Sequence, residues 1–345
     1  MTVQHSYKMV KEKKDIILQF LADTQSRTSK VQQLINAIIQ AINLGDLVPG
    51  DTLPSINQMS LSAYVSRDTV FKAYRELVRR GTIESSPQRG YFIATDLNKV
   101  MLFLDTYSSF KDTLYHNLRS NLPENYGVDL YFHHYNFRVF ESILLDNIGQ
   151  YSMYVVMNFN HDMLSDVLKK IDANKLLILD WGRFEKGNYA YVCQDFDQAV
   201  YNSLVSGLQR IRAYDEFVLI FPNETYHPHE TINAFKQFCK DYAIKHNIIN
   251  VFDPFTKLEN KLFFVIDEVD LVQIVKTTNS AKLELGKDVG IISYNDTPMK
   301  EIIGNGISVI STDFALMGKM AADFVLHKQK LQLIIPTTLT ERGSL

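Results

Sequence analysis

The chain has 345 residues, of which 46% are hydrophobic and 22% charged, and its length favours two domains over one. With 36 Lys and Arg against 39 Asp and Glu, the formal net charge of −3 excludes both a basic field over the whole molecule and an acidic disordered chain. The charge is uneven: residues 1–95 carry 12 basic and 8 acidic side chains, whereas residues 96–345 carry 24 and 31. We therefore expect the front part to bind a polyanion.

Motifs for metals, cofactors and membranes are missing from the sequence. Cys193 and Cys239 are far apart and lie in no zinc-like spacing, which argues against a disulfide framework and indicates a reducing compartment. His227 and His229 have no further ligand cluster and are more typical of a surface. No apolar stretch approaches the roughly 18 residues of a membrane span, and the first residues lack the apolar core of a signal peptide. We therefore expect a cytoplasmic protein. Phosphate-loop and nucleophile-elbow motifs are missing too, so we expect no cofactor, no metal and no enzyme activity.

Three short helices and a hairpin are predicted near the N-terminus. Apolar residues recur at helical spacing between residues 30 and 44. Ser55, with a glutamine three residues later, forms a capping box that starts a second helix, and Ser66 starts a third that Gly81 ends. Two β-prone pieces follow within residues 82–93 and predict a small hairpin. This order is typical of a winged helix-turn-helix.

The third helix is the predicted recognition helix, because the first turn of such a helix enters the major groove of DNA. Arg67 can grip a guanine edge or a phosphate, Lys72 suits the DNA backbone, and Arg89 at the wing tip suits the minor groove or a phosphate. The alternative is that Ser66 only caps the helix, Asp68 only complements its dipole, and the arginines are a solvated face. The predicted DNA-binding residues are Ser55, Ser66, Arg67, Asp68, Thr69, Lys72, Arg89 and Gly90.

The run from Lys30 to Ile93 resembles the GntR family of winged-helix transcription regulators. The likeness is carried by the segments 42–55, Val65-Ser-Arg-Asp-Thr-Val70, Ala73-Tyr-Arg-Glu-Leu77 and Arg89-Gly-Tyr-Phe92. In that family Leu-Pro-Ser is usually followed by Glu-Arg, whose arginine touches DNA, but here Ile56 and Asn57 follow. Phe71 also stands where many members have an arginine. The resemblance implies DNA binding with more weight on Arg67, Lys72 and Arg89, and it leaves the operator sequence open.

From residue 99 onwards, apolar strands alternate with helical patterns, which predicts parallel sheet covered on both faces, with ligands at the carboxyl ends of the strands. The predicted domains are a winged helix-turn-helix over 30–95 and an α/β domain over 96–345, whereas the extension 1–29 has no assigned role. Predicted strands are 100–104, 128–132, 154–157, 176–179, 217–221, 262–266, 289–293 and 308–310. Predicted helices are 110–120, 197–212, 230–246 and 314–327.

The C-terminal third is similar to a LacI-type, periplasmic-binding-protein-like domain. The segments 287–298, 307–314, 317–322 and 335–342 carry the likeness, which strand order extends towards residue 99. Such domains have two lobes of parallel sheet and bind a small sugar between them. The fold class is therefore α/β, a winged helix-turn-helix followed by a two-lobed parallel-sheet domain.

Sugar recognition needs carboxylates and amides that clasp hydroxyl groups, together with an aromatic face against the ring. The family's acidic residue falls on Asn295, so Asp296 or a weaker acceptor takes its place, and Thr231 stands where an arginine is common. His227, His229 or Glu230 can replace that arginine, or the ligand lacks the group it would hold. The predicted effector residues are Tyr107, Phe110, Asp180, Trp181, Arg183, Asp195, Asp267, Asn295 and Asp296.

Each predicted effector residue also has an ordinary structural alternative. Asp180 and Asp195 can be turn formers at strand ends, and Tyr107 and Trp181 can be packing residues. Trp181 and Phe184 are the expected stacking faces. A pocket short of arginine and rich in aromatic rings favours a neutral pentose or deoxyhexose, such as arabinose or fucose, over a sugar phosphate.

These expectations combine into one hypothesis, a homodimeric transcription regulator that binds a pseudo-palindromic DNA operator and a small sugar effector. The resemblance to the family implies that it represses a carbohydrate-utilisation operon. In one rival, an α/β enzyme domain is fused to a DNA anchor. In another, the protein binds DNA constitutively and its C-terminal domain serves only dimerisation.

Overall fold

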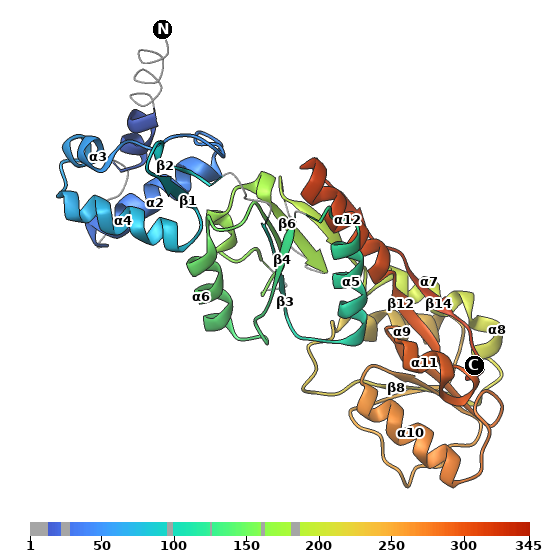
Figure 1. The fold of residues 1–345 in the computed structure, drawn as a ribbon. Coiled ribbons are helices and arrows are strands. Elements are labelled where there is room, and N and C mark those ends of the chain that lie inside the picture. Colours follow the sequence, from blue (N-terminus) through green and yellow to red (C-terminus); the bar gives the residue numbers. More distant parts are fainter. Residues whose placement is uncertain (1–12, 22–27, 95–98, 125, 160–162, 181–186) are drawn as a thin grey trace. The chain divides into compact units, whose positions relative to one another are not determined.

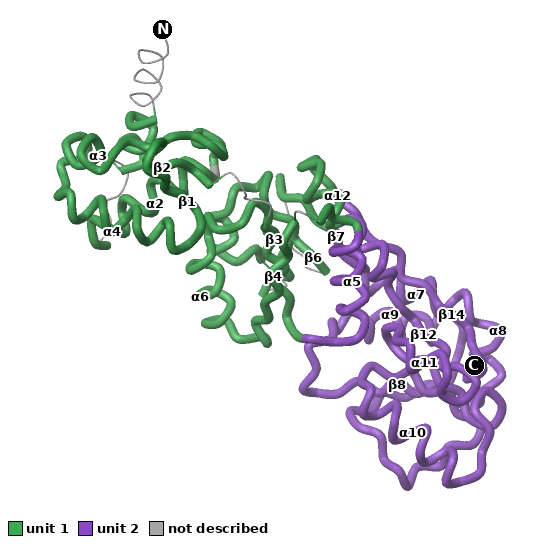
Figure 2. Tube along the Cα trace, in the orientation of Figure 1, with its two compact units in different colours: residues 1–106, 121–191, 321–331 green, residues 107–120, 192–320, 332–345 purple. Residues whose placement is uncertain are grey.

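The computed structural model describes residues 13–21, 28–94, 99–124, 126–159, 163–180 and 187–345. The chain divides into two compact units, coloured separately in Figure 2. Unit 1 comprises Met1–Thr106, Asn121–Tyr191 and Ala321–Leu331, and unit 2 comprises Tyr107–Ser120, Val192–Met320 and Gln332–Leu345. None of the helices in these described ranges is long and apolar enough to cross a membrane.

The first part of unit 1 is the predicted three-helix and wing arrangement (Figure 1). Its helices are α2 (Lys30–Asn43), α3 (Ile56–Ala63) and α4 (Arg67–Arg79), and its antiparallel hairpin is β1 (Ile83–Ser86) with β2 (Gly90–Ile93). Serine hydroxyls accept hydrogen bonds from backbone N–H groups at the start of all three helices, and the capping box of α3 is complete, as its sequence predicts.

The segment before residue 30 contributes to this core. Residues 13–21 form a helix whose Ile17 is fully buried and whose Phe20 is 8% exposed, both in the apolar cluster of α2, α3 and α4. Lys13 pairs with Asp51 at 2.6 Å. The extension therefore adds a helix to the winged helix, a role that its sequence did not reveal.

Unit 1 also holds most of a parallel sheet. The sheet has the strand order β13-β7-β6-β5-β3-β4, and its pairs β4-β3, β3-β5 and β5-β6 are parallel as predicted. The strands are β3 (Lys99–Leu104), β4 (Gly127–Phe132), β5 (Met153–Met157), β6 (Leu176–Asp180), β7 (Ala190–Cys193) and β13 (Gln332–Ile334). The helical elements are α6 (Phe137–Asn147), η1 (Leu168–Lys170) and η2 (Ala173–Lys175).

Unit 2 is built on a second sheet, of order β14-β12-β11-β10-β8-β9, which is parallel except for the edge strand β14. The strands are β8 (Glu216–Ile220), β9 (His246–Ile249), β10 (Lys261–Val265), β11 (Val289–Tyr294), β12 (Ser308–Thr312) and β14 (Thr337–Thr340). The helices are α5 (Ser109–Ser120), α7 (Gln198–Ser206), α8 (Leu208–Ile211), α9 (Glu230–Asp241), α10 (Glu268–Ser280), α11 (Pro298–Ile302), the short η3 (Ile303–Asn305) and α12 (Phe314–His327), which continues into unit 1.

The structure corrects two predicted helices. The helix predicted over 230–246 ends at Asp241, because the chain turns through Ala243 at φ +53° into the short edge strand β9. The helix predicted over 197–212 is divided at Gly207, where a Cβ atom would lie 2.5 Å from Leu339. Close packing against β14 therefore breaks a helix that its apolar pattern alone would continue.

Candidate functional site

The recognition helix α4 has one buried and one exposed face. Val70, Ala73, Tyr74 and Leu77 are fully buried, and the hydroxyl of Tyr74 donates to the carbonyl of Pro54 at 2.9 Å. This packing ties α4 to the turn before α3 and leaves the opposite face of α4 open to solvent.

The N-terminal turn of α4 is capped from within. The Ser66 hydroxyl accepts from the backbone N–H of Thr69 at 3.0 Å, and the two side-chain hydroxyls lie 2.8 Å apart. Ser66 therefore caps α4, and in the same way the Ser55 hydroxyl is used by the capping box of α3. DNA contacts from these hydroxyls remain predictions.

Some charged residues of this face already form ion pairs within the protein, and others do not. Asp68 and Lys72 form an ion pair at 2.7 Å with both side chains more than 60% exposed. Arg67 is exposed and has no hydrogen bond or ion pair within the described ranges, and Arg75 two turns later is the same. Arg75 was not predicted, although its spacing from Arg67 places it on the same side of the helix. Arg67 and Arg75 are thus the basic side chains of this face that have no hydrogen-bond or ion-pair partner among the described residues.

The wing-tip arginine lies folded against the winged helix. The guanidinium of Arg89 donates to the carbonyl of Gly50 and lies over the Phe92 ring, 4.5 Å from its centroid. Gly90 beside it has φ +73°, as the tight turn of the wing requires. A groove contact from Arg89 would have to replace these contacts, so its predicted role remains a prediction.

In unit 2, aromatic rings gather at the carboxyl edge of the sheet. Tyr294 ends β11, and its ring centroid lies 4.4 Å from that of His227 and 6.1 Å from that of Phe196, with which it is nearly parallel. Phe221 follows β8 and packs edge-on against His227 at 5.8 Å. We call Phe196, Phe221, His227 and Tyr294 the aromatic cluster. The sequence singles out only His227 among them, although Phe221 directly follows β8 and Tyr294 is the last residue of β11.

The aromatic cluster is uncharged. Burial lowers the pKa of His227 to about 3, so its imidazole is neutral near pH 7, and its Nε2 lies 2.8 Å from the hydroxyl of Thr231. Thr231 is fully buried on α9, at the position where the resembling family commonly has an arginine. The pair of His227 and Thr231 therefore puts a neutral hydrogen-bonding group where a cation was expected.

Asn295 directly follows Tyr294 in the chain, and its backbone conformation and its side-chain oxygen are both suited to binding a ligand. Its backbone is left-handed at φ +58°, and its buried Oδ1 has no hydrogen-bond partner among the described residues. Lys300, which is 2% exposed and was not predicted, donates to the carbonyls of Tyr294 at 3.0 Å and Asn295 at 2.8 Å. Burial lowers the pKa of Lys300 to about 8. Lys300 therefore holds the backbone that presents the Asn295 amide.

The three predicted carboxylates of unit 2, Asp195, Asp267 and Asp296, already accept hydrogen bonds from other groups of the protein. Asp296 forms two hydrogen bonds with Arg342, at 2.9 and 2.6 Å. Asp267 caps α10 by accepting from the N–H of Val269 at 2.6 Å, and Asp195 accepts from two backbone N–H groups of the next turn. The turn-former alternative fits Asp195, Asp267 is a helix cap, and Asn295 offers the more available acceptor.

Two of the predicted residues meet in a cavity of ≈ 380 Å³ within unit 2. Phe110 and Asp296 both line it, and Phe110 packs on Phe314 with ring centroids 4.7 Å apart. Tyr107 is 65% exposed. Asp180 is buried at the end of β6 with φ +75°. Trp181, Arg183 and Phe184 lie outside the described residues.

Unit 1 has its own polar residues at the carboxyl ends of strands. Asp105 follows β3 and accepts a hydrogen bond from the Tyr135 hydroxyl, beyond β4, at 2.6 Å. Neither residue was predicted, although an acid directly after an apolar strand was a usable signal. Among the described residues, no three of His, Cys, Asp and Glu lie close enough together to hold a metal ion.

Comparison with family models assigns both ends of the chain. Residues 30–93 match the model of bacterial regulatory proteins of the gntR family, and residues 212–345 match the model of a periplasmic binding protein-like domain. The chain therefore carries a GntR-type winged helix followed by a periplasmic-binding-protein-like domain, and the combination expected from the sequence is confirmed.

Curated relatives match the front of the chain. The chain is 32% identical over 80 residues, or 23% of its length, to the HTH-type transcriptional repressor YtrA of Bacillus subtilis (strain 168). It is 34% identical over 74 residues, or 21% of its length, to the uncharacterized HTH-type transcriptional regulator YhcF of the same organism. These matches span 62% and 61% of the relatives' own lengths, about three fifths.

Solved structures match the larger part of the chain. The trehalose repressor from Escherichia coli aligns with TM-score 0.57 and 16% identity, over 70% of this chain and all of that one. A LacI family transcriptional regulator from Arthrobacter sp. FB24, in complex with lactose, aligns with TM-score 0.58 and 11% identity, over 71% of this chain and 98% of that one. At such identities the likeness shows the fold. These named proteins are transcription regulators, which agrees with the expectation that the protein is not an enzyme.

Proposed function

We propose that the protein is a DNA-binding transcription regulator controlled by a neutral small sugar. The observation that carries the proposal is the combination in one chain of a GntR-type winged helix, with Arg67 exposed on its recognition helix, and a periplasmic-binding-protein-like domain. Similar proteins support both halves, since one is named a transcriptional repressor and another was solved in complex with lactose.

The finer parts of the proposal follow from the site chemistry. Aromatic rings, a neutral imidazole and the Asn295 amide suit hydroxyl groups and the C–H face of a sugar ring, and they offer no cation for a phosphate. We propose a pentose or deoxyhexose such as arabinose or fucose, which releases a repressor from a carbohydrate-utilisation operon. We further propose a homodimer, because a twofold protein reads a pseudo-palindromic operator. The sugar acts only if its affinity differs between two states of the protein.

Ligand binding is tested by thermal unfolding of the full chain over matched free and phosphorylated sugars. A specific sugar at 100 times its Kd is expected to stabilise the protein by about 2.7 kcal/mol. Stabilisation by a phosphorylated sugar through the Asn295 site, or by no sugar at all, contradicts the effector assignment and leaves DNA binding standing.

DNA binding is tested with Arg67→Ala on an operator selected from random duplexes. Loss of a groove contact is expected to weaken binding by about tenfold or more with little change in Tm. Arg210→Ala is the matched control, because Arg210 is also an exposed arginine but lies in unit 2. Unaltered operator binding by Arg67→Ala would show that the recognition helix is misplaced.

A further inference from the structure

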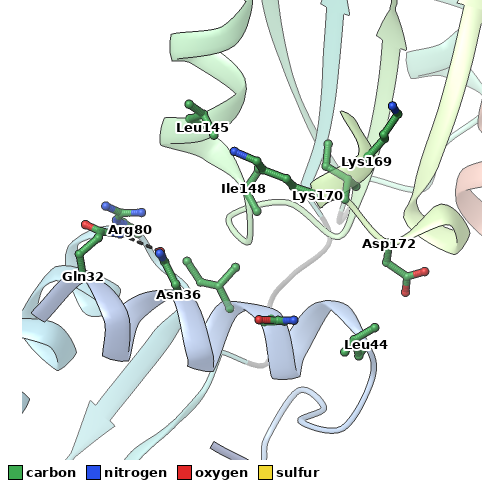
Figure 3. Close-up of a pocket in the computed structure, with 12 residues that line it drawn as sticks. Gln32, Asn36, Leu44, Arg80, Leu145, Ile148, Lys169, Lys170 and Asp172 are labelled. Atoms are coloured by element: carbon green, nitrogen blue, oxygen red, sulfur yellow. Dashed lines mark hydrogen bonds between the residues drawn. The ribbon is translucent and has the colours of Figure 1, made fainter. Parts of the chain in front are cut away.

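A second pocket lies within unit 1, beside α2 and the C-terminal end of α4. It is a cavity of ≈ 500 Å³, bordered on one side by α2 and Arg80 and on the other by α6 and η1 (Figure 3). We call it the junction pocket. Its size suits a small organic molecule, and none of its residues belongs to the predicted DNA-binding or effector residues.

The two walls of the junction pocket are in direct contact beside it. Gly149, just after α6, lies so close to Ile39 of α2 that a Cβ atom there would be 2.6 Å from the Ile39 side chain. The Lys175 ammonium donates to the carbonyl of Ile42 in the last turn of α2 at 3.0 Å. α2 has no basic residue of its own in that turn, so Lys175 supplies the cation that the helix end favours. The pocket is therefore a feature of packed elements.

The α2 wall is a row of amides. Gln32, Asn36 and Gln40 are spaced four residues apart and lie on one face of the helix, towards the cavity. The Gln32 amide donates to Oδ1 of Asn36 at 2.8 Å, which leaves the N–H donors of Asn36 for another acceptor. Such a row can bind hydroxyl or phosphate oxygens.

Arg80 is a cationic residue of the pocket that is suited to bind an oxyanion. Its side chain is only 14% exposed, and its Nε donates to Glu76 at 2.8 Å. Its terminal nitrogens have no hydrogen-bond partner among the described residues, and Arg80 lines the cavity. Hydrogen bonds from Arg79 and Arg80 hold the pKa of Glu76 at about 2, so Glu76 stays ionised and keeps Arg80 in place. A largely buried guanidinium fork with unused donors fits a phosphate or carboxylate in two-point contact.

The opposite wall adds a cation and an apolar surface. Lys170 borders the cavity and has no ion pair within the described part of the chain, in contrast to its neighbour Lys169, which pairs with Asp166. Leu145 and Ile148 complete this wall with aliphatic carbon.

We propose that the junction pocket binds a second effector, a small phosphorylated sugar or similar polyhydroxylated oxyanion. Its anionic group lies between Arg80 and Lys170, and its hydroxyl groups contact the amides of α2. This effector is distinct from the neutral sugar proposed for unit 2, because the chemistry of the two sites differs: the cationic side chains of Arg80 and Lys170 border the junction pocket, whereas the aromatic cluster and the Asn295 amide are uncharged. A ligand there contacts both the winged helix and the sheet part of unit 1.

The test is calorimetric titration of the full chain with glucose 6-phosphate, ribose 5-phosphate, citrate, glucose, ribose and inorganic phosphate. We expect a sugar phosphate to bind more tightly than citrate or inorganic phosphate, and the matched free sugar to show no binding that depends on Arg80. Arg80→Gln and Lys170→Gln are each expected to weaken binding by about tenfold or more, since each removes a charged hydrogen bond. Lys170 is exposed, so its variant is expected to fold even if Arg80→Gln does not.

Arg79→Gln is the matched control, because Arg79 also bonds Glu76 but does not line the pocket. Full affinity in both Arg80→Gln and Lys170→Gln overturns the proposal, as does the lack of any binding by the oxyanions. Inorganic phosphate that binds as tightly as the sugar phosphates overturns the part played by the amides. The response to a neutral sugar is expected to persist in Lys170→Gln, so failure here is distinguishable from failure of the proposed function.

Discussion

The exposed face of α4 and the aromatic cluster of unit 2 are built in opposite ways. The α4 face comes from one stretch of chain, its charges are solvated, and its nearest ion pair is more than 60% exposed on both sides. The aromatic cluster and Asn295 come from segments up to 99 residues apart, between Phe196 and Asn295, and depend on a buried lysine and a desolvated histidine. Substitutions of the exposed charges on the first surface should therefore change binding with little effect on stability, whereas substitutions of the buried His227 or Lys300 in the second should change stability as well.

The largest expected effect is the acid sensitivity that His227 gives to unit 2. Its pKa is about 3 in the folded protein and about 6.5 when unfolded, so the unfolded chain binds more protons between these values. Stability is therefore fully present above pH 6.5 and falls as the pH drops towards 3. Because the side chain is only partly buried, we expect on the order of 1–3 kcal/mol between pH 7 and pH 4.5, measured by urea unfolding.

His227→Phe keeps a ring and removes the titration, so its stability should depend less on pH over this range. His246→Gln is the control, because His246 is an exposed histidine of the same unit. Equal pH dependence in the wild type and His227→Phe would show that His227 is not the group responsible.

The next effect concerns the Asn295 amide and sharpens the contrast between binding and stability. Asn295→Gly keeps the left-handed backbone that Lys300 holds and removes the unpartnered Oδ1. We expect the affinity for the proposed neutral sugar to fall by about tenfold, the worth of one hydrogen bond of about 1 kcal/mol or more, with a small change in Tm. Asn305→Gly is the control, since Asn305 also has a positive φ but does not follow the cluster. Unchanged sugar affinity in Asn295→Gly would remove Asn295 from the site.

A smaller effect separates the capping role of Ser66 from DNA contact. Ser66→Ala removes the cap of α4 and is expected to cost about 1 kcal/mol of stability, measured by chemical unfolding. Ser29→Ala removes the equivalent cap of α2 and should cost about the same. If Ser66 only caps, the two variants bind operator equally well once both are folded. Weaker binding by Ser66→Ala alone would assign it a DNA contact.

The same contrast explains how much the sequence could predict. Helical spacing and the caps at Ser55 and Ser66 define α2, α3 and α4, because those signals are local. Apolar runs likewise predict the central strands, which are buried on both faces. The break at Gly207 depends on a contact with β14, and the edge strand β9 depends on the turn that precedes it. No local pattern in the sequence encodes either feature. For the same reason Lys300 was missed: a lysine reads as a surface residue until the carbonyls of Tyr294 and Asn295 are known to surround it.

The smallest expected effect lies on the α4 face itself and separates a DNA role of Lys72 from a purely structural one. Its exposed ion pair with Asp68 should contribute less than about 0.5 kcal/mol, so Asp68→Asn is expected to leave Tm almost unchanged. The variant also removes a negative charge beside Arg67 and releases the Lys72 ammonium. If this face meets the DNA backbone, operator affinity should rise a few-fold at low salt, and this gain should shrink as salt increases because phosphate contacts release counterions. Asp166→Asn frees Lys169 from a similar exposed pair in the sheet part of unit 1 and should not change operator affinity. An affinity that falls in Asp68→Asn would mean that the carboxylate itself contacts a base or orders Lys72 for its contact, and the pair would then act as one unit in recognition.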